Sequence, residues 1–201
     1  MSLDSTLVRI DEISRLFAPP LAPTAPPPPA SAGATSFARA LSQAGEAPAA
    51  SGLPGGGNQR MVSLAQAEVG QTEQPRGSNN SARIAEYRSA VPGGPIGPWC
   101  AYFASWVARE AGMPLGDRGQ GFARVDDVWA WAQRNGRATP AGPNVTPRPG
   151  DLIIWDEHMG IVESVRPDGS IQTIEGNSSD QVARRVHPGG GGNAVGFVRM
   201  S

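Results

Sequence analysis

The sequence has only one cysteine and no lysine, and the scarcity of these two residue types excludes several classes of protein. A single cysteine can form neither an intrachain disulfide nor a cysteine-clustered zinc site. The 17 basic residues are all arginine, and they leave a formal net charge of −1, so the chain lacks the basic excess typical of nucleic-acid binding. No run approaches the roughly 18 apolar residues that a transmembrane helix needs. We therefore expect no nucleic-acid partner and no membrane span.

Aromatic residues are scarce in the first part of the chain. Ten of the twelve lie after residue 86, so a sizeable core is expected only in the second part. Between residues 18 and 58, 31 of the 41 positions are Ala, Pro, Gly or Ser, a composition that buries too little apolar surface to offset the entropy of ordering. We expect residues 18–58 to be a disordered Pro/Ala/Gly-rich linker and residues 59–201 to form the folded domain.

Residues 1–17 differ from the linker that follows them. Apolar side chains recur at three- and four-residue steps, as at Leu3, Leu7 and Ile10, which predicts a short amphipathic helix. Such a helix could pack on a protein partner, serve as an export or targeting element, or join the core of the main domain. Acidic residues stand where a signal peptide would carry its basic segment, so we expect no conventional signal peptide.

The period of the apolar pattern changes along the folded part of the chain. Helical spacing predicts four helices, over residues 61–69, 81–90, 100–111 and 125–135. Apolar or alternating runs then predict strands over residues 151–155, 160–165, 170–175 and 195–200. The middle two strands flank the turn Pro167-Asp168-Gly169, which is typical of a hairpin. Helices followed by antiparallel strands predict an α+β fold.

Cys100 is the first candidate for chemistry. It follows a turn rich in Pro and Gly and is expected to open a helix. The positive end of the helix dipole and the free backbone N–H groups would favour its thiolate, and the same N–H groups could hold an oxyanion. The alternative is that the lone cysteine is a small buried core residue.

Three residues further along the chain could complete such a site. His158 is expected at the entry to a strand, which is a rigid mount for a general base. Glu175 ends the strand after the hairpin, and Asn177 would share its face. Either could bond the far ring nitrogen of His158 and fix its tautomer, or both could be ordinary turn residues. The second histidine, His187, precedes a glycine run and is interpreted as a surface residue.

Four ordered motifs resemble those of the CHAP family (cysteine, histidine-dependent amidohydrolase/peptidase), a papain-like group that acts on bacterial peptidoglycan. The motifs are PWCAYFASWV at residues 98–107, RPGDLIIW at 148–155, HMGIVE at 158–163 and IEGN at 174–177. The resemblance covers roughly residues 60–200. It implies N-terminal helices packed on a small antiparallel sheet, with the cleft between them.

The resemblance also implies roles for individual residues. Cys100 would be the nucleophile, His158 the general base and acid, Glu175 the orienting acid and Asn177 a supporting polar residue. Three aromatic residues close to these in the sequence are expected to line the substrate cleft: Trp99, Tyr102 and Trp155. Some members carry an acidic calcium loop before the cysteine, but residues 93–98 hold no carboxylate, so we expect no metal and no cofactor.

The implied function is hydrolysis of an amide bond in peptidoglycan, either N-acetylmuramoyl-L-alanine cleavage or cleavage within the peptides. We expect a monomer acting at the cell wall or outside the cell, cytoplasmic before export, with export or appendage machinery as the partner of residues 1–17. Two alternatives stay open. One is a catalytically silent, flagellum- or phage-associated docking module that binds peptidoglycan, and the other is a cysteine amidohydrolase for small molecules or peptides.

Overall fold

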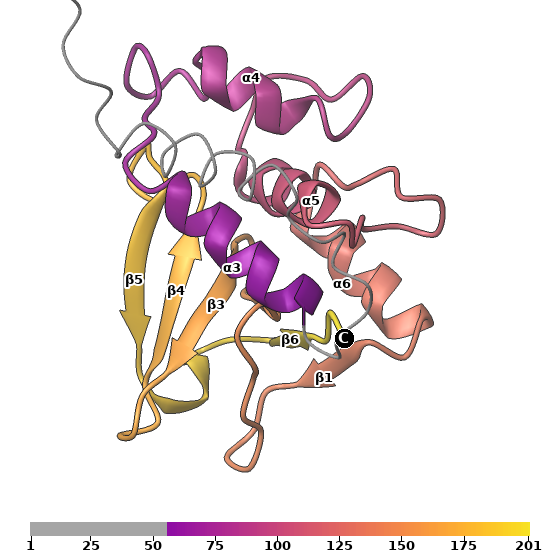
Figure 1. Ribbon diagram of the computed structural model, residues 1–201, viewed down its shortest axis with the longest axis vertical. Helices are drawn as coiled ribbons and strands as arrows, with labels where there is room; N and C mark the ends of the chain where they lie inside the picture. The colour runs from indigo at the N-terminus through magenta and orange to yellow at the C-terminus, as the bar shows by residue number, and fades with distance from the viewer. Residues whose placement is uncertain (1–55) are drawn as a thin grey trace, which may run out of the picture. The chain divides into compact units, whose positions relative to one another are not determined.

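The structure, a computed structural model, describes residues 56–201. The expected helix at residues 1–17 and most of the linker at 18–58 lie outside the described residues. Four helices come first, as the apolar spacing predicted, and the first begins slightly before residue 59. They are α3 (Gly56–Ala67), α4 (Ala82–Arg88), α5 (Cys100–Glu110) and α6 (Val125–Arg134), shown in Figure 1.

A six-stranded sheet follows, with the strand order β1-β6-β2-β3-β4-β5. Every neighbouring pair is antiparallel, so the α+β expectation is confirmed. The strands are β1 (Ala138–Pro140), β2 (Leu152–Ile154), β3 (Met159–Val165), β4 (Ile171–Glu175), β5 (Ala183–His187) and β6 (Gly196–Val198). A short 3-10 helix, η1 (Gly189–Gly191), lies between β5 and β6.

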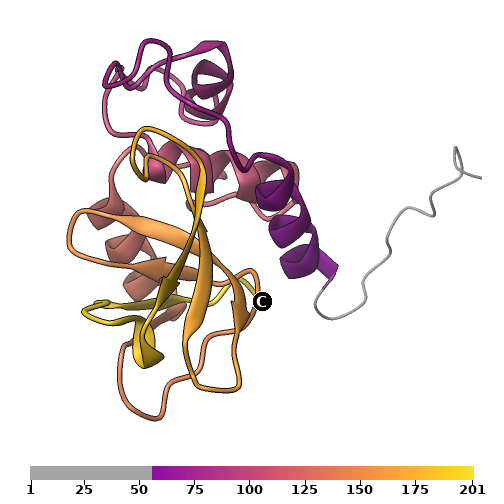
Figure 2. The same cartoon turned by 90° about the vertical axis from the view of Figure 1, so that its left-hand side faces the viewer.

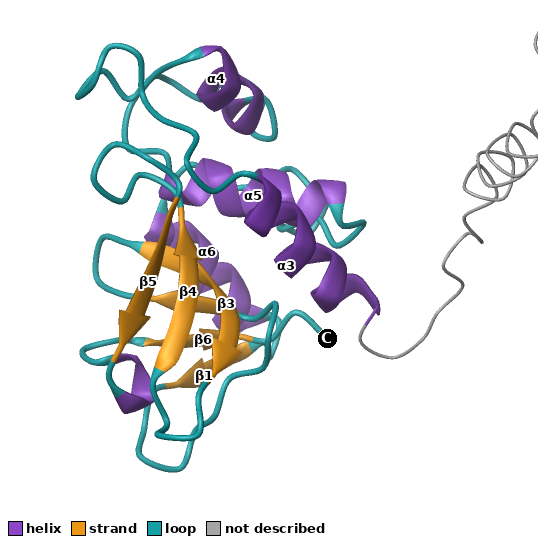
Figure 3. Ribbon diagram, turned by 60° about the vertical axis from the view of Figure 1, so that its left-hand side comes forward, coloured by secondary structure: helices purple, strands orange, loops and turns teal. Residues whose placement is uncertain are grey.

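The two faces of the sheet bury different apolar clusters, because alternate residues of a strand point to opposite faces. One face packs against the helices through residues such as Ile154, Ile161 and Ile174. The other face carries the smaller cluster Ile153, Trp155, Val162, Ile171 and Phe197. Figures 2 and 3 show α3 and α5 beside β3, which both helices contact. The sheet is thus covered on one face by helices and on the other by loops.

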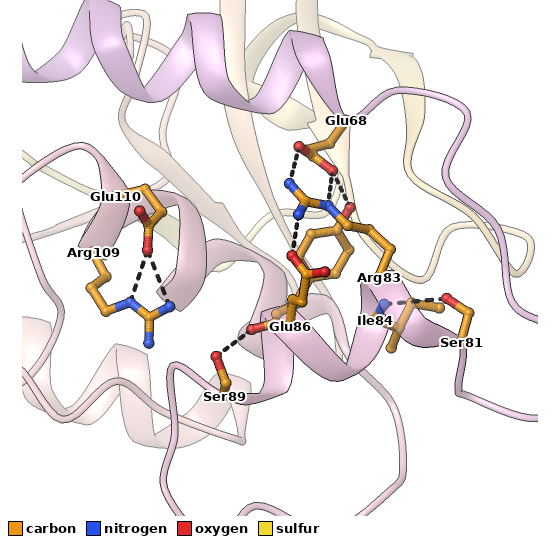
Figure 4. Close-up of polar contacts among 9 residues, drawn as sticks. Glu68, Ser81, Arg83, Ile84, Glu86, Ser89, Arg109 and Glu110 are labelled. Atoms are coloured by element: carbon orange, nitrogen blue, oxygen red, sulfur yellow. Dashed lines mark hydrogen bonds and ion pairs between the residues drawn. The ribbon is translucent and has the colours of Figure 1, made fainter. Parts of the chain in front are cut away.

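Helix α5 lies at the centre of the larger cluster, since every residue from Cys100 to Ala108 is buried. Its first turn is supported by α4, where Tyr87 stacks on Trp99 with ring centroids 5.8 Å apart. Tyr87 is in turn fixed by Glu68, whose Oε2 accepts a hydrogen bond from the Tyr87 hydroxyl at 2.6 Å. Figure 4 shows Glu68 also accepting from Arg83, with Nε at 2.7 Å. These bonds tie α4 to the residue that follows α3, and the stacking of Tyr87 on Trp99 holds α4 against the start of α5.

Candidate active site

Cys100 is the first residue of α5, as expected. No side chain caps this helix at Trp99. The first helical hydrogen bond runs from the Phe103 N–H to the Trp99 carbonyl at 2.9 Å, so the N–H groups of Cys100, Ala101 and Tyr102 are not used by the helix. The thiol therefore stands at the positive end of a helix, beside donors that an oxyanion could accept from.

His158 and Glu175 come together because β3 and β4 are paired. His158 immediately precedes β3, Glu175 is the last residue of β4, and Ile161 pairs with Ile174 between them. Nε2 of His158 lies 2.9 Å from Oε2 of Glu175. Glu175 is thus the residue that contacts the imidazole, while Asn177 lies in the following turn at a φ of 58°.

Each charged group of the site stabilises the charge of its neighbour. Burial lowers the pKa of His158, but hydrogen bonds and charges from Cys100 and Glu175 outweigh it and raise that pKa to about 9. Burial raises the pKa of Glu175, but hydrogen bonds from His158, Thr173 and His187 bring it down to about 2. At neutral pH the site therefore holds an imidazolium between a carboxylate and the Cys100 sulfur. Because Glu175 occupies Nε2, the ring nitrogen left for Cys100 is Nδ1.

Two glycines allow the close approach of these elements. A Cβ at Gly160 would lie 2.7 Å from Cγ of Glu175, so only glycine leaves room for that side chain. A Cβ at Gly176 would lie 2.6 Å from Cβ of Phe103, where the end of β4 crosses α5. These contacts give a physical reason for the glycines in the HMG and EGN motifs.

The Gly160→Ala variant is expected to displace Glu175 and to lower hydrolysis of the substrate proposed below about ten- to a hundredfold, because Oε2 no longer meets His158 squarely. Gly142→Ala is the matched control, since its Cβ would meet only a side-chain carbon of Val145 at an ordinary 3.8 Å. Initial rates and melting temperatures of the two variants check this. Equal rates for Gly160→Ala and the wild type would show that the fit at Gly160 does not matter for the site.

A pocket of about 300 Å³ opens beside the thiol. Its lining carries charges of both signs and contains Pro98, Cys100, Ala123, Arg124, Val125, Asp126, Asp156 and Glu157. The walls come from the turn before α5, the start of α6 and the turn before β3. A polar chain such as a peptide could enter here and reach the sulfur.

The three aromatic residues expected in the cleft are buried, and none of them is among the residues that line this pocket. Trp99 is fully buried and its Nε1 donates to Oε1 of Glu73 at 2.8 Å. Tyr102 is 2% exposed, and its hydroxyl donates to the Pro95 carbonyl at 3.1 Å. Both therefore support the start of α5 and do not line the pocket, which corrects the expectation. Trp155 is also buried, and it packs on His158 with ring centroids 5.7 Å apart.

The interpretation of His187 as a surface residue is wrong. It ends β5, a strand that the sequence analysis did not predict, and only 24% of its side chain is exposed. Its Nε2 lies 2.7 Å from Oε1 of Glu175. The signal available in the sequence was weak: the apolar residues of ARRVH are few, and the next five residues are a proline and four glycines.

Within residues 56–201, no three His, Cys, Asp or Glu side chains are grouped as a metal ion would need. In the same range, no helix combines the length and the apolar character that crossing a bilayer requires.

The fold brings together a thiol at the start of a helix, an imidazole and a carboxylate. These three groups are the ones that a cysteine-dependent hydrolase uses. Comparison with protein families agrees with this class. The CHAP domain family model matches residues 92–177, a range that contains Cys100, His158 and Glu175. Residues 92–177 therefore match the CHAP family, which is the family predicted from the four motifs. CHAP domains are generally amidase or peptidase hydrolases, which suggests peptidoglycan hydrolysis or a related function. No curated protein matches the chain.

Proposed function

We propose that this protein is a peptidoglycan hydrolase that cleaves an amide bond by a Cys–His–Glu mechanism. The observation that carries the proposal is the 2.9 Å contact between His158 and Glu175 beside Cys100, whose sulfur helps to raise the pKa of that imidazole. Cys100 also forms part of the lining of a pocket. A structural cysteine would need neither a charged partner nor a place in a pocket wall.

In the proposed first step, the Cys100 thiolate attacks the amide carbonyl and forms a new C–S bond. The carbonyl oxygen becomes an oxyanion, which accepts from the unused N–H groups at the start of α5. His158, protonated at neutral pH, gives its proton to the leaving amine as the C–N bond breaks. The products of this step are a free amine and a thioester on Cys100.

In the second step, neutral His158 takes a proton from water, which attacks the thioester carbonyl. The C–S bond then breaks, a carboxylic acid leaves, and the thiolate–imidazolium pair is restored. Glu175 keeps its charge throughout, because its pKa of about 2 lies far below neutral pH. Its task is to hold the imidazole in place and to stabilise its positive charge.

The substrate class follows from the CHAP domain and from the pocket. A charged, open pocket beside the thiol suits a polar peptide better than an apolar small molecule. We propose that the bond lies between the muramoyl group and alanine or within the peptides, and that the protein acts at the cell wall or outside the cell. Residues 1–17 would then bind a protein of export or appendage machinery.

Digestion of purified peptidoglycan, with products separated and weighed by mass spectrometry, tests the proposal. New fragments are expected with the wild type, and peptide-free glycan would identify cleavage at the muramoyl amide, whereas shortened peptides would identify an endopeptidase. Walls that differ in peptide composition should be compared, with small amides and short peptides assayed in parallel. Hydrolysis confined to the small amides, or no products from any wall, would contradict the proposed substrate.

A further inference from the structure

We infer that His187 is a positioning residue that fixes Glu175 for its contact with His158, so that the site is the linear set Cys100–His158–Glu175–His187. The inference rests on the proposed function for its kinetic consequences but not for its geometry. His187 also lies beyond residue 177, where the match to the family model ends.

The two carboxylate oxygens of Glu175 are held separately. Oε2 lies 2.9 Å from Nε2 of His158. Oε1 lies 2.7 Å from Nε2 of His187 and accepts a hydrogen bond from the Thr173 hydroxyl at 2.6 Å. Only 4% of the Glu175 side chain is exposed, so water does little to compete for these positions. Two donors thus hold Oε1 of Glu175, while Oε2 contacts the imidazole of His158.

The strand register explains how the distant residues meet. Thr173 and Glu175 are two residues apart on β4 and point to the same face. His187 pairs with Ile171, which lies two residues before Thr173 on the same face of β4. The side chains of His187 and Glu175 therefore lie on one face of the sheet, where they meet. A one-residue slip of β5 would turn His187 to the other face, so the contact is a product of the whole sheet.

Trp155 joins the two histidines physically. Its ring lies 4.5 Å from the ring of His187 and 5.7 Å from that of His158, centroid to centroid. The indole N–H donates to the Gly191 carbonyl at 3.0 Å, in the short helix that follows β5. The indole therefore fixes both imidazoles and ties the glycine run after His187 to the site.

The physical role of His187 follows from the freedom of a carboxylate group. The terminal torsion of a glutamate is broad, so a carboxylate held at one oxygen can still rotate. Bonds from Thr173 and His187 to Oε1 remove that rotation and keep Oε2 aimed at His158. They also help to keep Glu175 ionised, which strengthens its pull on the imidazolium.

The charged groups that face His187 are few among the described residues. Glu175 contributes the one charge in direct contact from β4. Arg185 shares the face of His187 on β5, but its guanidinium donates to the Ser178 carbonyl at 3.2 Å. His158 lies on the other side of Glu175, packed on Trp155. A change at His187 should therefore reach His158 through Glu175.

Two substitutions separate the hydrogen bond from the packing. His187→Phe keeps a ring against Trp155 but removes the donor, whereas His187→Gln keeps a donor near the position of Nε2. We expect His187→Phe to lower kcat for peptidoglycan about ten- to a hundredfold with little change in KM, and His187→Gln to recover most of the loss. Melting temperatures of the two variants verify that both are folded.

A titration without substrate decides the inference independently of the proposed function. The chain has only two histidines, so either variant leaves the His158 ring alone in a histidine-labelled NMR spectrum. The midpoint of its titration is expected near 9 in the wild type and clearly lower in His187→Phe, with His187→Gln restoring it. An unchanged midpoint in His187→Phe would overturn the inference, and so would equal losses in the two folded variants. If the wild type hydrolyses nothing, the titration still tests His187, and only the proposed function fails.

Discussion

The Cys100→Ala variant is expected to lose peptidoglycan hydrolysis by a factor on the order of 10⁴ or more, because the chain has no second thiol to form the thioester. The substitution removes a single sulfur atom from the first residue of α5 and leaves the backbone hydrogen bonds of the helix in place. The fold should therefore survive. Initial rates of product release, read by mass spectrometry, measure the loss.

Cys100→Ser is the companion variant, because it keeps a nucleophilic atom of similar size in the same place. We expect its rate to remain at least about a hundredfold below that of the wild type, since a hydroxyl is far harder to deprotonate than a thiol. Far-ultraviolet circular dichroism and melting curves should be the same for all three proteins. Substantial hydrolysis by folded Cys100→Ala would show that another group performs the chemistry.

Replacing His158 by Ala is expected to have the second largest effect, a loss of about 10²- to 10⁴-fold in kcat, because His158 is the group proposed to transfer the proton in both steps. The wild-type rate should also depend on pH in a defined direction. His158 has a pKa of about 9, so it is protonated below that pH and loses its proton as the pH rises through it. The rate of amine release is expected to fall on that alkaline side.

Glu175→Gln tests the source of this pH dependence, because it keeps the shape of the side chain and removes its charge. Without that charge and its hydrogen bond, the pKa of His158 should fall, so the alkaline decline of the rate should begin at a lower pH than in the wild type. Glu110→Gln, the same chemical change at the far end of α5, is the control. Identical profiles for wild type and Glu175→Gln would contradict the proposed role of Glu175.

Most elements of the folded part could be predicted, because their signals are local. The spacing of apolar residues marked all four helices, and the turn at Pro167 marked the hairpin of β3 and β4. The strands β1 and β5 could not be predicted in this way. β1 contains Pro140, and β5 reads ARRVH with alternating exposure, so both lie at the edges of the sheet and depend on pairing with distant residues.

The site shows the same division. Cys100, His158 and Glu175 each occupy the first or last position of an element or the residue beside it, so boundaries read from sequence placed them well. The direction of a side chain is set by packing and not by its neighbours in the sequence. Trp99 was predicted to line the cleft because it precedes Cys100, but its indole points inward and donates to Glu73. His187 was missed because its contact with Glu175 exists only once β5 has paired with β4.

The most direct test of the account is to alkylate the protein stepwise with iodoacetamide at pH 6 and to plot residual peptidoglycan hydrolysis against the labelled fraction. Cys100 is the only thiol, so one mass increment reports one site. We expect labelling to be faster in the folded protein than in the urea-unfolded chain, and hydrolysis to fall in proportion to the labelled fraction. Fully labelled protein that still hydrolyses peptidoglycan, or a folded thiol no more reactive than the unfolded one, would contradict a Cys–His–Glu hydrolase.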